Sequence, residues 1–314
     1  MTAASLAFEL LVMISIGIFI RRRGIVGEEF ASSLTNFMLT VTLPCMIVQS
    51  MNLPFSRQQM KQGGTLLLVS LALLSLYFIL GQLTYRLVGG GARGRSFRFG
   101  CIFTNFTFMG LPVVDSLYGQ EGLFYFVIFI IPFRLAYYAS AAPLLTPAEL
   151  RPANRSALHA LRGFITPPVL AAFLGLFLYV TQLPLPTLIH HILSTVGGVS
   201  TPLGMILCGL SLGGFQIKDF ASPRYLALPA LRNLAIPALT CALLLPLPLA
   251  PMIKQLLTVF AALPVASLLA AFTIQYDPDP ASRLESGGAV FLSTLLSAVT
   301  LPLWAYLAAL IFTG

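Results

Sequence analysis

An apolar stretch near residues 103–115 holds the polar side chains that are best placed to do chemistry. Asn105 and Thr107 lie in a run long enough to cross a bilayer, and Gly110 and Pro112 follow them. Proline lacks a backbone N–H and clashes with the preceding turn, so it removes helical hydrogen bonds. In hydrocarbon, the freed carbonyls must be satisfied by neighbouring helices or face a water-filled cavity. The spacing predicts a helix that is interrupted at residues 110–112 and binds a ligand there.

A second stretch in the other half of the chain has the same small-Leu-Pro pattern. It contains Pro264 within an apolar run, with Ser267 close behind. Interrupted helices in corresponding halves of a membrane protein indicate the substrate site of a transporter. We therefore expect Pro264 and Ser267 to line that site together with the polar residues of the first stretch.

Two arginines lie deep inside apolar runs. Arg134 stands about a dozen residues into its run, roughly 18 Å at 1.5 Å per residue, and Arg232 is followed directly by Asn233. A mid-membrane arginine costs at least ~2.5–3.5 kcal/mol and therefore needs a partner or a wet cavity. One interpretation is that Arg134, Arg232 and Asn233 bind an anionic substrate or stand where related transporters bind a coupling cation. The alternative is that the arginines are structural, tied to carbonyls freed at the broken helices or to Glu9.

The composition places the chain among membrane proteins. It has 314 residues, of which 57% are hydrophobic and only 9% charged, against about 25% charged in soluble domains. The net charge of +8 resides in short loops, so we expect no nucleic-acid partner. The four cysteines lie in apolar runs and are expected to be packing residues. We expect no metal and no cofactor.

The elements that must position these residues are membrane-spanning helices. Apolar runs separated by Gly, Pro and charge predict an all-α membrane protein with ten spans. The expected spans are 3–20, 30–51, 63–86, 98–118, 122–146, 164–183, 187–215, 224–248, 252–276 and 286–312.

Basic residues predict the orientation of the spans. Those in the loops after odd-numbered spans are Arg21, Arg22, Arg23, Arg86, Arg93, Arg95, Arg98, Arg151, Arg155, Arg162, Lys218, Arg224 and Arg283. The opposite side holds only Arg57, Lys61 and Lys254. Because cytoplasmic loops are rich in Lys and Arg, the loops after odd-numbered spans are expected in the cytoplasm and both termini outside.

The two halves also break at corresponding places. Prolines in spans 2, 4 and 5 have counterparts 152–170 residues later in spans 7, 9 and 10. An odd number of spans per unit makes the second unit enter from the opposite face. We expect two inverted five-helix repeats, 1–146 and 164–314, joined by a cytoplasmic loop, 147–163, with spans 4 and 9 broken. Frequent proline in membrane helices is the simpler explanation of the pattern.

Several segments resemble the auxin efflux carrier family, and the resemblance extends over essentially the whole chain. They are residues 21–26 after the first span, 34–45, Asn105 with residues 110–112, 262–264 with Gln275 and Tyr276, and 293–302. The resemblance implies ten spans, a scaffold domain and a mobile transport domain, with unwound spans 4 and 9 crossing at the substrate site. It also implies a fold like that of bile-acid symporters and sodium/proton antiporters, and a place in a bacterial inner membrane with the termini on the periplasmic side. Many relatives have an asparagine shortly after the second crossover proline, whereas this chain has Ser267 and Leu268.

The resemblance also implies a function. Plant and bacterial members, the latter linked to malate or malonate, suggest a small organic anion as substrate. We expect a secondary or facilitative carrier, working by an elevator-type movement in the lipid bilayer, and a homodimer. Uniport and proton coupling both fit, and sodium is less favoured because acidic ligands are scarce. The alternative is a ten-span channel or sensor. No catalytic motif is present, so we do not expect an enzyme.

Overall fold

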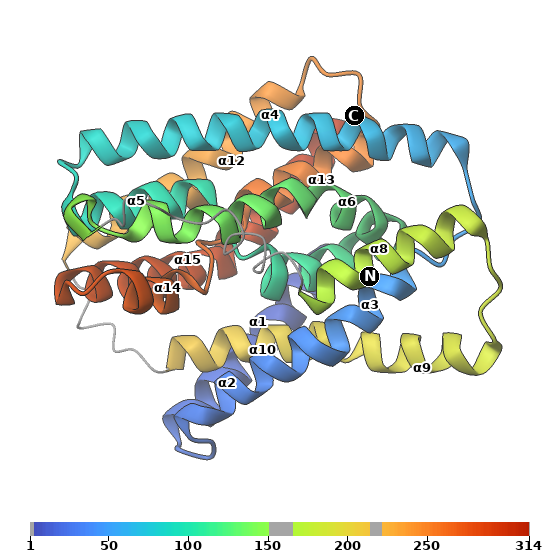
Figure 1. Ribbon diagram of the computed structural model, residues 1–314, viewed down its shortest axis with the longest axis horizontal. Helices are drawn as coiled ribbons and strands as arrows, with labels where there is room; N and C mark the ends of the chain where they lie inside the picture. Colours follow the sequence, from blue (N-terminus) through green and yellow to red (C-terminus); the bar gives the residue numbers. More distant parts are fainter. Residues whose placement is uncertain (1–2, 151–165, 214–221, 314) are drawn as a thin grey trace. The chain divides into compact units, whose positions relative to one another are not determined.

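The computed structural model describes residues 3–150, 166–213 and 222–313, and these residues are almost entirely helical (Figure 1). The described residues contain one isolated antiparallel bridge and no longer strand. The helices are α1 (Ala3–Arg22), α2 (Glu28–Phe37), α3 (Leu43–Ser50), α4 (Arg57–Leu87), α5 (Gly91–Ile102), α6 (Leu111–Leu145), α8 (Pro167–Thr181), α9 (Thr187–Gly198), α10 (Ser200–Gly213), α11 (Ala227–Ala230), α12 (Ile236–Leu244), α13 (Pro251–Ala262), α14 (Leu269–Tyr276) and α15 (Pro280–Thr313).

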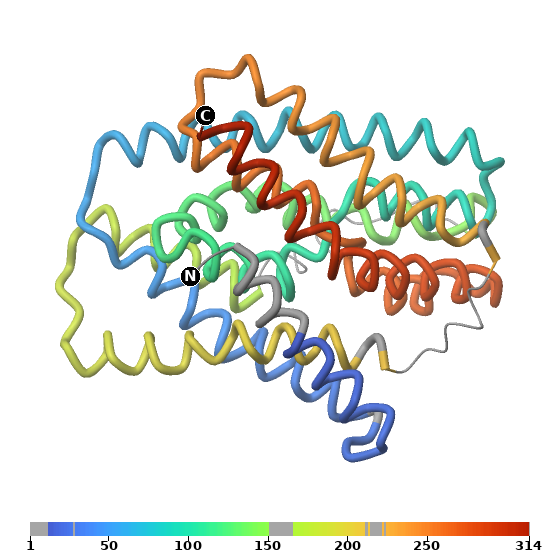
Figure 2. The backbone as a smooth tube through the Cα atoms, turned by 180° about the vertical axis from the view of Figure 1, so that it is seen from behind, coloured from blue at the N-terminus to red at the C-terminus, as the bar shows by residue number. Residues whose placement is uncertain are grey.

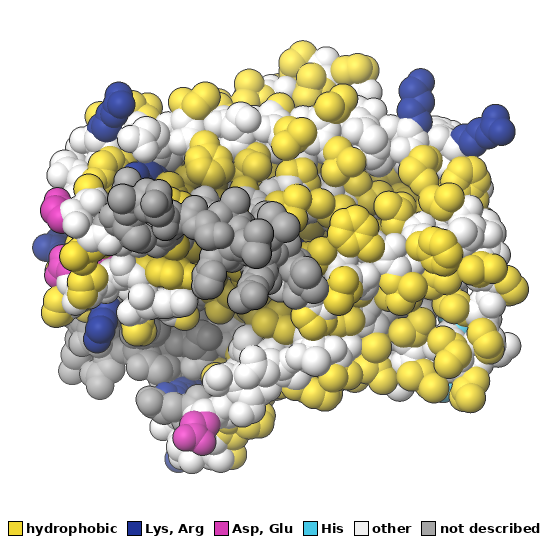
Figure 3. Space-filling view, viewed as in Figure 1, with side chains coloured by type: hydrophobic (Ala, Val, Ile, Leu, Met, Phe, Trp, Pro, Cys, Tyr) yellow, Lys and Arg dark blue, Asp and Glu magenta, His cyan; other side chains and the backbone are white. Residues whose placement is uncertain are grey.

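Within the described residues, six helical segments are long and apolar enough to cross a membrane. They are Glu29–Ser50, Arg57–Leu87, Phe106–Leu145, Thr187–Leu210, Arg224–Leu244 and Pro280–Thr313, and the shorter apolar helices α8 and α13 accompany them. Hydrophobic side chains cover much of the face drawn in Figure 3. Many large apolar side chains are exposed, among them Leu68 at 69% and Leu188 at 68%. In water, the exposure of this much apolar surface would be unfavourable in free energy. The all-α membrane class is therefore confirmed.

The chain forms two compact units, and each combines stretches from both halves of the sequence. The first unit comprises Met1–Ser70, Thr107–Ile131 and Ile165–Gly214, and the second comprises Leu71–Phe106, Pro132–Phe164 and Phe215–Gly314. Much of the expected connecting loop, including Arg151, Arg155 and Arg162, lies outside the described residues, as do Lys218 and the side chain of Glu9.

In the first unit, α1 lies along α10, and α3 packs against α8 and α9 (Figure 1). The contact between α1 and α10 depends on glycine. A Cβ added to Gly17 would lie 2.2 Å from the carbonyl oxygen of Ile206, and one added to Gly209 would lie 2.0 Å from that of Ile14. Small residues let membrane helices approach this closely, and the larger contact area replaces the missing hydrophobic driving force.

In the second unit, α15 packs against α5, α13 and α14. The orange-to-red tube of Figure 2 shows α13 and α15 side by side. An ion pair fastens α5 to the segment before α15: the Arg95 guanidinium lies 2.7 Å from Asp277 Oδ2 and donates to Ser282 Oγ at 3.1 Å. The side chains of Arg95 and Asp277 are only 11% and 1% exposed.

Replacing Asp277 with alanine is expected to destabilise the protein by about 3–5 kcal/mol, because it leaves the guanidinium of Arg95 buried without its counter-charge. The apparent melting temperature of purified protein in detergent measures the effect. Glu29→Ala is a matched control, since Glu29 is an exposed carboxylate. A melting temperature for Asp277→Ala equal to that of the control would contradict the role of the ion pair.

In the part of the chain that the structure describes, three π-helical segments each end two residues before a proline. They are Met38–Thr42, Phe106–Gly110 and Leu231–Ala235, which precede Pro44, Pro112 and Pro237. The missing proline N–H removes one helical hydrogen bond, and a wider turn relieves the clash with the preceding carbonyl. Proline in these helices therefore changes the local winding without ending the helix.

The first break does not lie where it was predicted, because a π-helical turn accommodates Pro112 within the helix. The expected interruption at residues 110–112 is wrong, because Gly110 ends a π-helical turn and Pro112 is the second residue of α6. The chain leaves the helical conformation earlier, at Phe103, whose φ and ψ are −114° and 133°. A separate kink at Gly119, with φ 61°, falls between the expected fourth and fifth spans. Only glycine adopts this conformation without strain.

Candidate functional site

Two helices of the second unit end at extended segments that pair with each other. Helix α5 ends at Ile102 and α13 ends at Ala262, and the next residue in each case, Phe103 or Leu263, is extended. The predicted interruption at Pro264 is confirmed. We call the paired residues Phe103–Phe106 and Leu263–Ser267 the crossover.

The two extended segments of the crossover pair with each other. Thr104 and Val265 form an antiparallel bridge. The Asn105 N–H donates to the Pro264 carbonyl at 2.9 Å, and the Ala266 N–H donates to the Phe103 carbonyl at 3.2 Å. These bonds satisfy groups that would otherwise be unpaired in a buried environment, where each costs several kcal/mol.

Arg232 satisfies carbonyls at the ends of both broken helices. Its Nε donates to Leu263 O and its Nη1 donates to Cys101 O, each at 3.2 Å. The side chain is fully buried, and its guanidinium carbon lies 5.4 Å from the centre of the Tyr77 ring. Each helix C-terminus carries roughly half a negative charge, so one guanidinium balances the two ends. These contacts match the structural alternative for Arg232.

Asn233 turns to α15 instead. Its Nδ2 donates to Ser293 O at 2.9 Å, while Trp304 Nε1 donates to the Asn233 carbonyl at 2.9 Å. Ser293 Oγ in turn accepts the Val265 N–H at 3.1 Å. Asn233 therefore supports the crossover through Ser293, a residue that the sequence revealed only as part of the family resemblance.

Arg134 has a different environment. Arg134 is 6% exposed. Its guanidinium carbon lies 5.7 Å from the centre of the ring of Phe106, the residue that follows Asn105. Among the described residues none accepts a hydrogen bond from it, and Nη2 is buried without a partner. A buried guanidinium with no acceptor is costly. The arrangement suits an anion that enters from outside the protein.

The predicted site residues thus divide between the units. Asn105, Pro264 and Ser267 meet at the crossover, with Ser267 Oγ 3.5 Å from Asn105 Oδ1. Arg134 and Arg232 contact the crossover at Phe106 and Leu263, and Asn233 contacts Ser293 beside it. The other three, Thr107, Gly110 and Pro112, belong to the first unit. There, Pro112 Cγ and the Phe108 carbonyl pack against Gly204 of α10.

A multi-pass helical protein with two helices interrupted by paired extended segments has the features of a membrane transporter, and comparison with known proteins agrees. Residues 3–145 and 151–305 match the family described as membrane transport protein, and the chain belongs to this family, which is that of the auxin efflux carriers. A relative from Methanothermobacter thermautotrophicus, described as an uncharacterized transporter, is 27% identical over 312 residues, covering 97% of this chain and 98% of the relative. The resemblance found in the sequence is confirmed.

Proposed function

We propose that this transporter carries small organic anions, such as malate, malonate or auxin-like acids. The observation that supports the proposal is the buried guanidinium of Arg134, which lacks an acceptor and lies against Phe106 of the crossover. A planar guanidinium binds a carboxylate through two parallel hydrogen bonds.

The crossover supplies the rest of the site in this proposal. Asn105 and Ser267 offer an amide and a hydroxyl beside the unwound backbone. The N-termini of the segments that follow the breaks add a partial positive charge that favours an anion. Substrate contacts for Thr107, Gly110, Pro112, Pro264 and Asn233 remain predictions.

The proposed architecture is ten spans in two inverted repeats, 1–146 and 164–314, joined by residues 147–163. Helices occupy each expected span within the described residues, which supports this arrangement. Transport proceeds by an elevator-type movement that carries the crossover across the membrane. The protein is a homodimer of the bacterial inner membrane with periplasmic termini. It is driven by the membrane potential or by protons.

A ligand screen followed by flux measurements tests the function. Purified protein is heated with mono- and dicarboxylates, since a ligand that binds the folded state raises its stability by RT ln(1 + [L]/Kd). Stabilising acids are then offered to proteoliposomes. Saturable uptake supports a carrier, non-saturating flux supports the channel alternative, and the absence of both stabilisation and flux would reject the anion carrier.

Asn105→Ala is expected to reduce uptake by at least about tenfold, the equivalent of 1.4 kcal/mol, while the protein remains folded. The backbone bond from Asn105 to Pro264 does not need the side chain. Ser140→Ala is the control, because among the described residues the Ser140 hydroxyl bonds only within its own helix, to Ala136 O at 2.6 Å. Normal uptake by Asn105→Ala would place the substrate elsewhere.

A further inference from the structure

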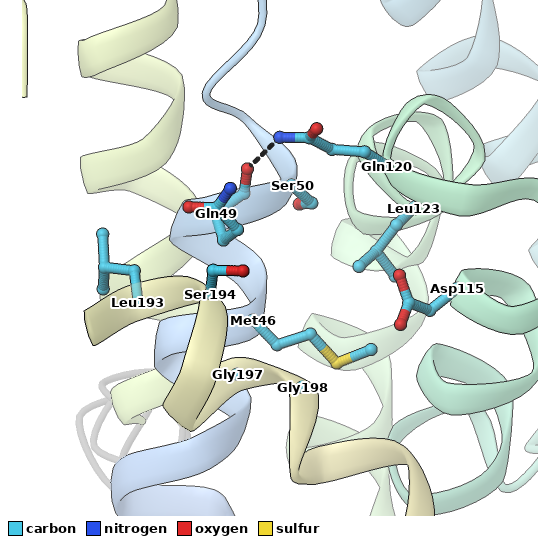
Figure 4. A pocket seen from close by; sticks show the side chains of 10 residues that line it. All are labelled: Met46, Gln49, Ser50, Asp115, Gln120, Leu123, Leu193, Ser194, Gly197 and Gly198. Carbon is cyan, nitrogen blue, oxygen red and sulfur yellow. Dashed lines mark hydrogen bonds between the residues drawn. The ribbon is translucent and has the colours of Figure 1, made fainter. Parts of the chain in front are cut away.

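A cavity of about 220 Å³ lies within the first unit, lined by α3, the start of α6, and α9 (Figure 4). It is larger than the roughly 30 Å³ that one water occupies in the liquid. It is smaller than the roughly 300–1,000 Å³ pockets that hold drug-sized ligands. Its size therefore fits a ligand of a few heavy atoms.

One carboxylate gives the cavity its charge. Asp115 points into it, and its described hydrogen-bond donor is the Thr201 hydroxyl, at the long distance of 3.4 Å (Figure 4). Among the described residues no Lys, Arg or His lies within ion-pair distance of Asp115. An acidic group inside a membrane-spanning segment is expensive unless something compensates its charge.

Two of the hydrogen-bond donors around the cavity are already engaged. The Gln120 amide donates to Gln49 O at 2.5 Å, and the Ser50 hydroxyl donates to Ile47 O at 2.7 Å. Acceptors remain available: the Asp115 carboxylate and Gln49 Oε1, which has no partner among the described residues. The Ser194 hydroxyl points into the same space (Figure 4).

The remaining wall is apolar. Met46, Leu123 and Leu193 line it, and the Met46 thioether extends toward Asp115 (Figure 4). A single negative charge favours a ligand with one positive charge. The available acceptors favour a ligand with N–H donors, and the apolar wall favours one with an alkyl group. We propose that this cavity binds a small organic ammonium ion, whose N–H groups donate to Asp115 and Ser194 and whose alkyl chain contacts Met46 and Leu193. This site is additional to the proposed anion site and does not depend on it.

Thermal stability of the purified full-length chain tests the proposal, with ethylammonium, tetramethylammonium and sodium chlorides compared at equal ionic strength. Ethylammonium is expected to raise the apparent melting temperature in a saturable way. Tetramethylammonium has the charge but no N–H, and sodium has no carbon, so neither should match it. An equal response to tetramethylammonium, a larger response to sodium, or no response to ethylammonium would overturn the proposal.

Variants localise the response. Asp115→Asn is expected to abolish the ethylammonium shift, whereas Glu121→Gln, which removes an exposed carboxylate from the same helix, should retain it. An unchanged shift in Asp115→Asn overturns the site. A second measurement does not depend on the folding of that variant: in Ser194→Cys, ethylammonium should slow labelling of the new thiol by a methanethiosulfonate reagent, and absence of protection overturns the proposal equally. Carboxylate binding is measured separately, so failure here leaves the anion proposal standing.

Discussion

Replacing Arg134 with glutamine is expected to abolish carboxylate binding and leave the protein folded. Losing a buried charged partner of a bound anion costs about 2–5 kcal/mol, which raises the Kd of malonate or malate by roughly 30-fold to several thousand-fold. Without ligand, the variant should be as stable as the wild type or more stable, because the buried charge has no acceptor to lose among the described residues.

Arg134→Lys keeps the charge but not the planar fork, so it is expected to recover only part of the affinity. Calorimetric titration of monodisperse protein measures the Kd of each variant. If Arg134→Gln binds the carboxylate with wild-type affinity, the guanidinium is not the anion receptor and the proposed function loses its main support.

The opposite result is expected for Arg232. Its two hydrogen bonds satisfy Leu263 O and Cys101 O, and a buried carbonyl left unsatisfied costs about 1–3 kcal/mol. Arg232→Gln should therefore lower the free energy of unfolding by about 2–6 kcal/mol and reduce the yield of folded protein. Arg232→Lys should lower the free energy of unfolding by a similar amount, because the single ammonium of lysine cannot reproduce both hydrogen bonds of the planar guanidinium.

Whatever fraction of Arg232→Gln folds should bind carboxylates normally. Size-exclusion chromatography and the apparent melting temperature report the folded fraction, and titration reports the affinity. A stable Arg232→Gln variant with lost carboxylate binding would return Arg232 to the substrate site, as the first interpretation of the sequence had it. Comparing the two Gln variants removes the effect of charge deletion alone.

Composition and local chemistry were enough to determine the class of protein and one of its two breaks. A chain with 57% hydrophobic and 9% charged residues cannot hide its apolar surface in water, so the membrane class follows directly. Pro264 ends α13 where expected, because the loss of a backbone donor is a local effect. The ordered motifs were specific enough to identify the family.

Tertiary structure decided where the first helix breaks and what each charged residue does. Pro112 could be absorbed by a π-helical turn, whereas Thr104 and Asn105 left the helix because Pro264 and Val265 offered them backbone partners. The Thr104–Asn105 pair within an apolar run was the available signal, since such residues compete for backbone hydrogen bonds.

The two arginines look alike in sequence, each a lone charge within an apolar run. Both guanidiniums lie against an aromatic ring, and Nη2 of each is buried without a partner among the described residues. Their difference arises because Arg232 donates to carbonyls of α5 and the crossover, whereas Arg134 donates to no acceptor among the described residues. In the sequence, Asp115 is likewise only an acid near the end of an expected span. In the structure, it lines a cavity together with residues of α3 and α9. Sequence determines which charges must be compensated in a membrane, but only the packing of distant helices decides which of them find partners among the described residues and which do not.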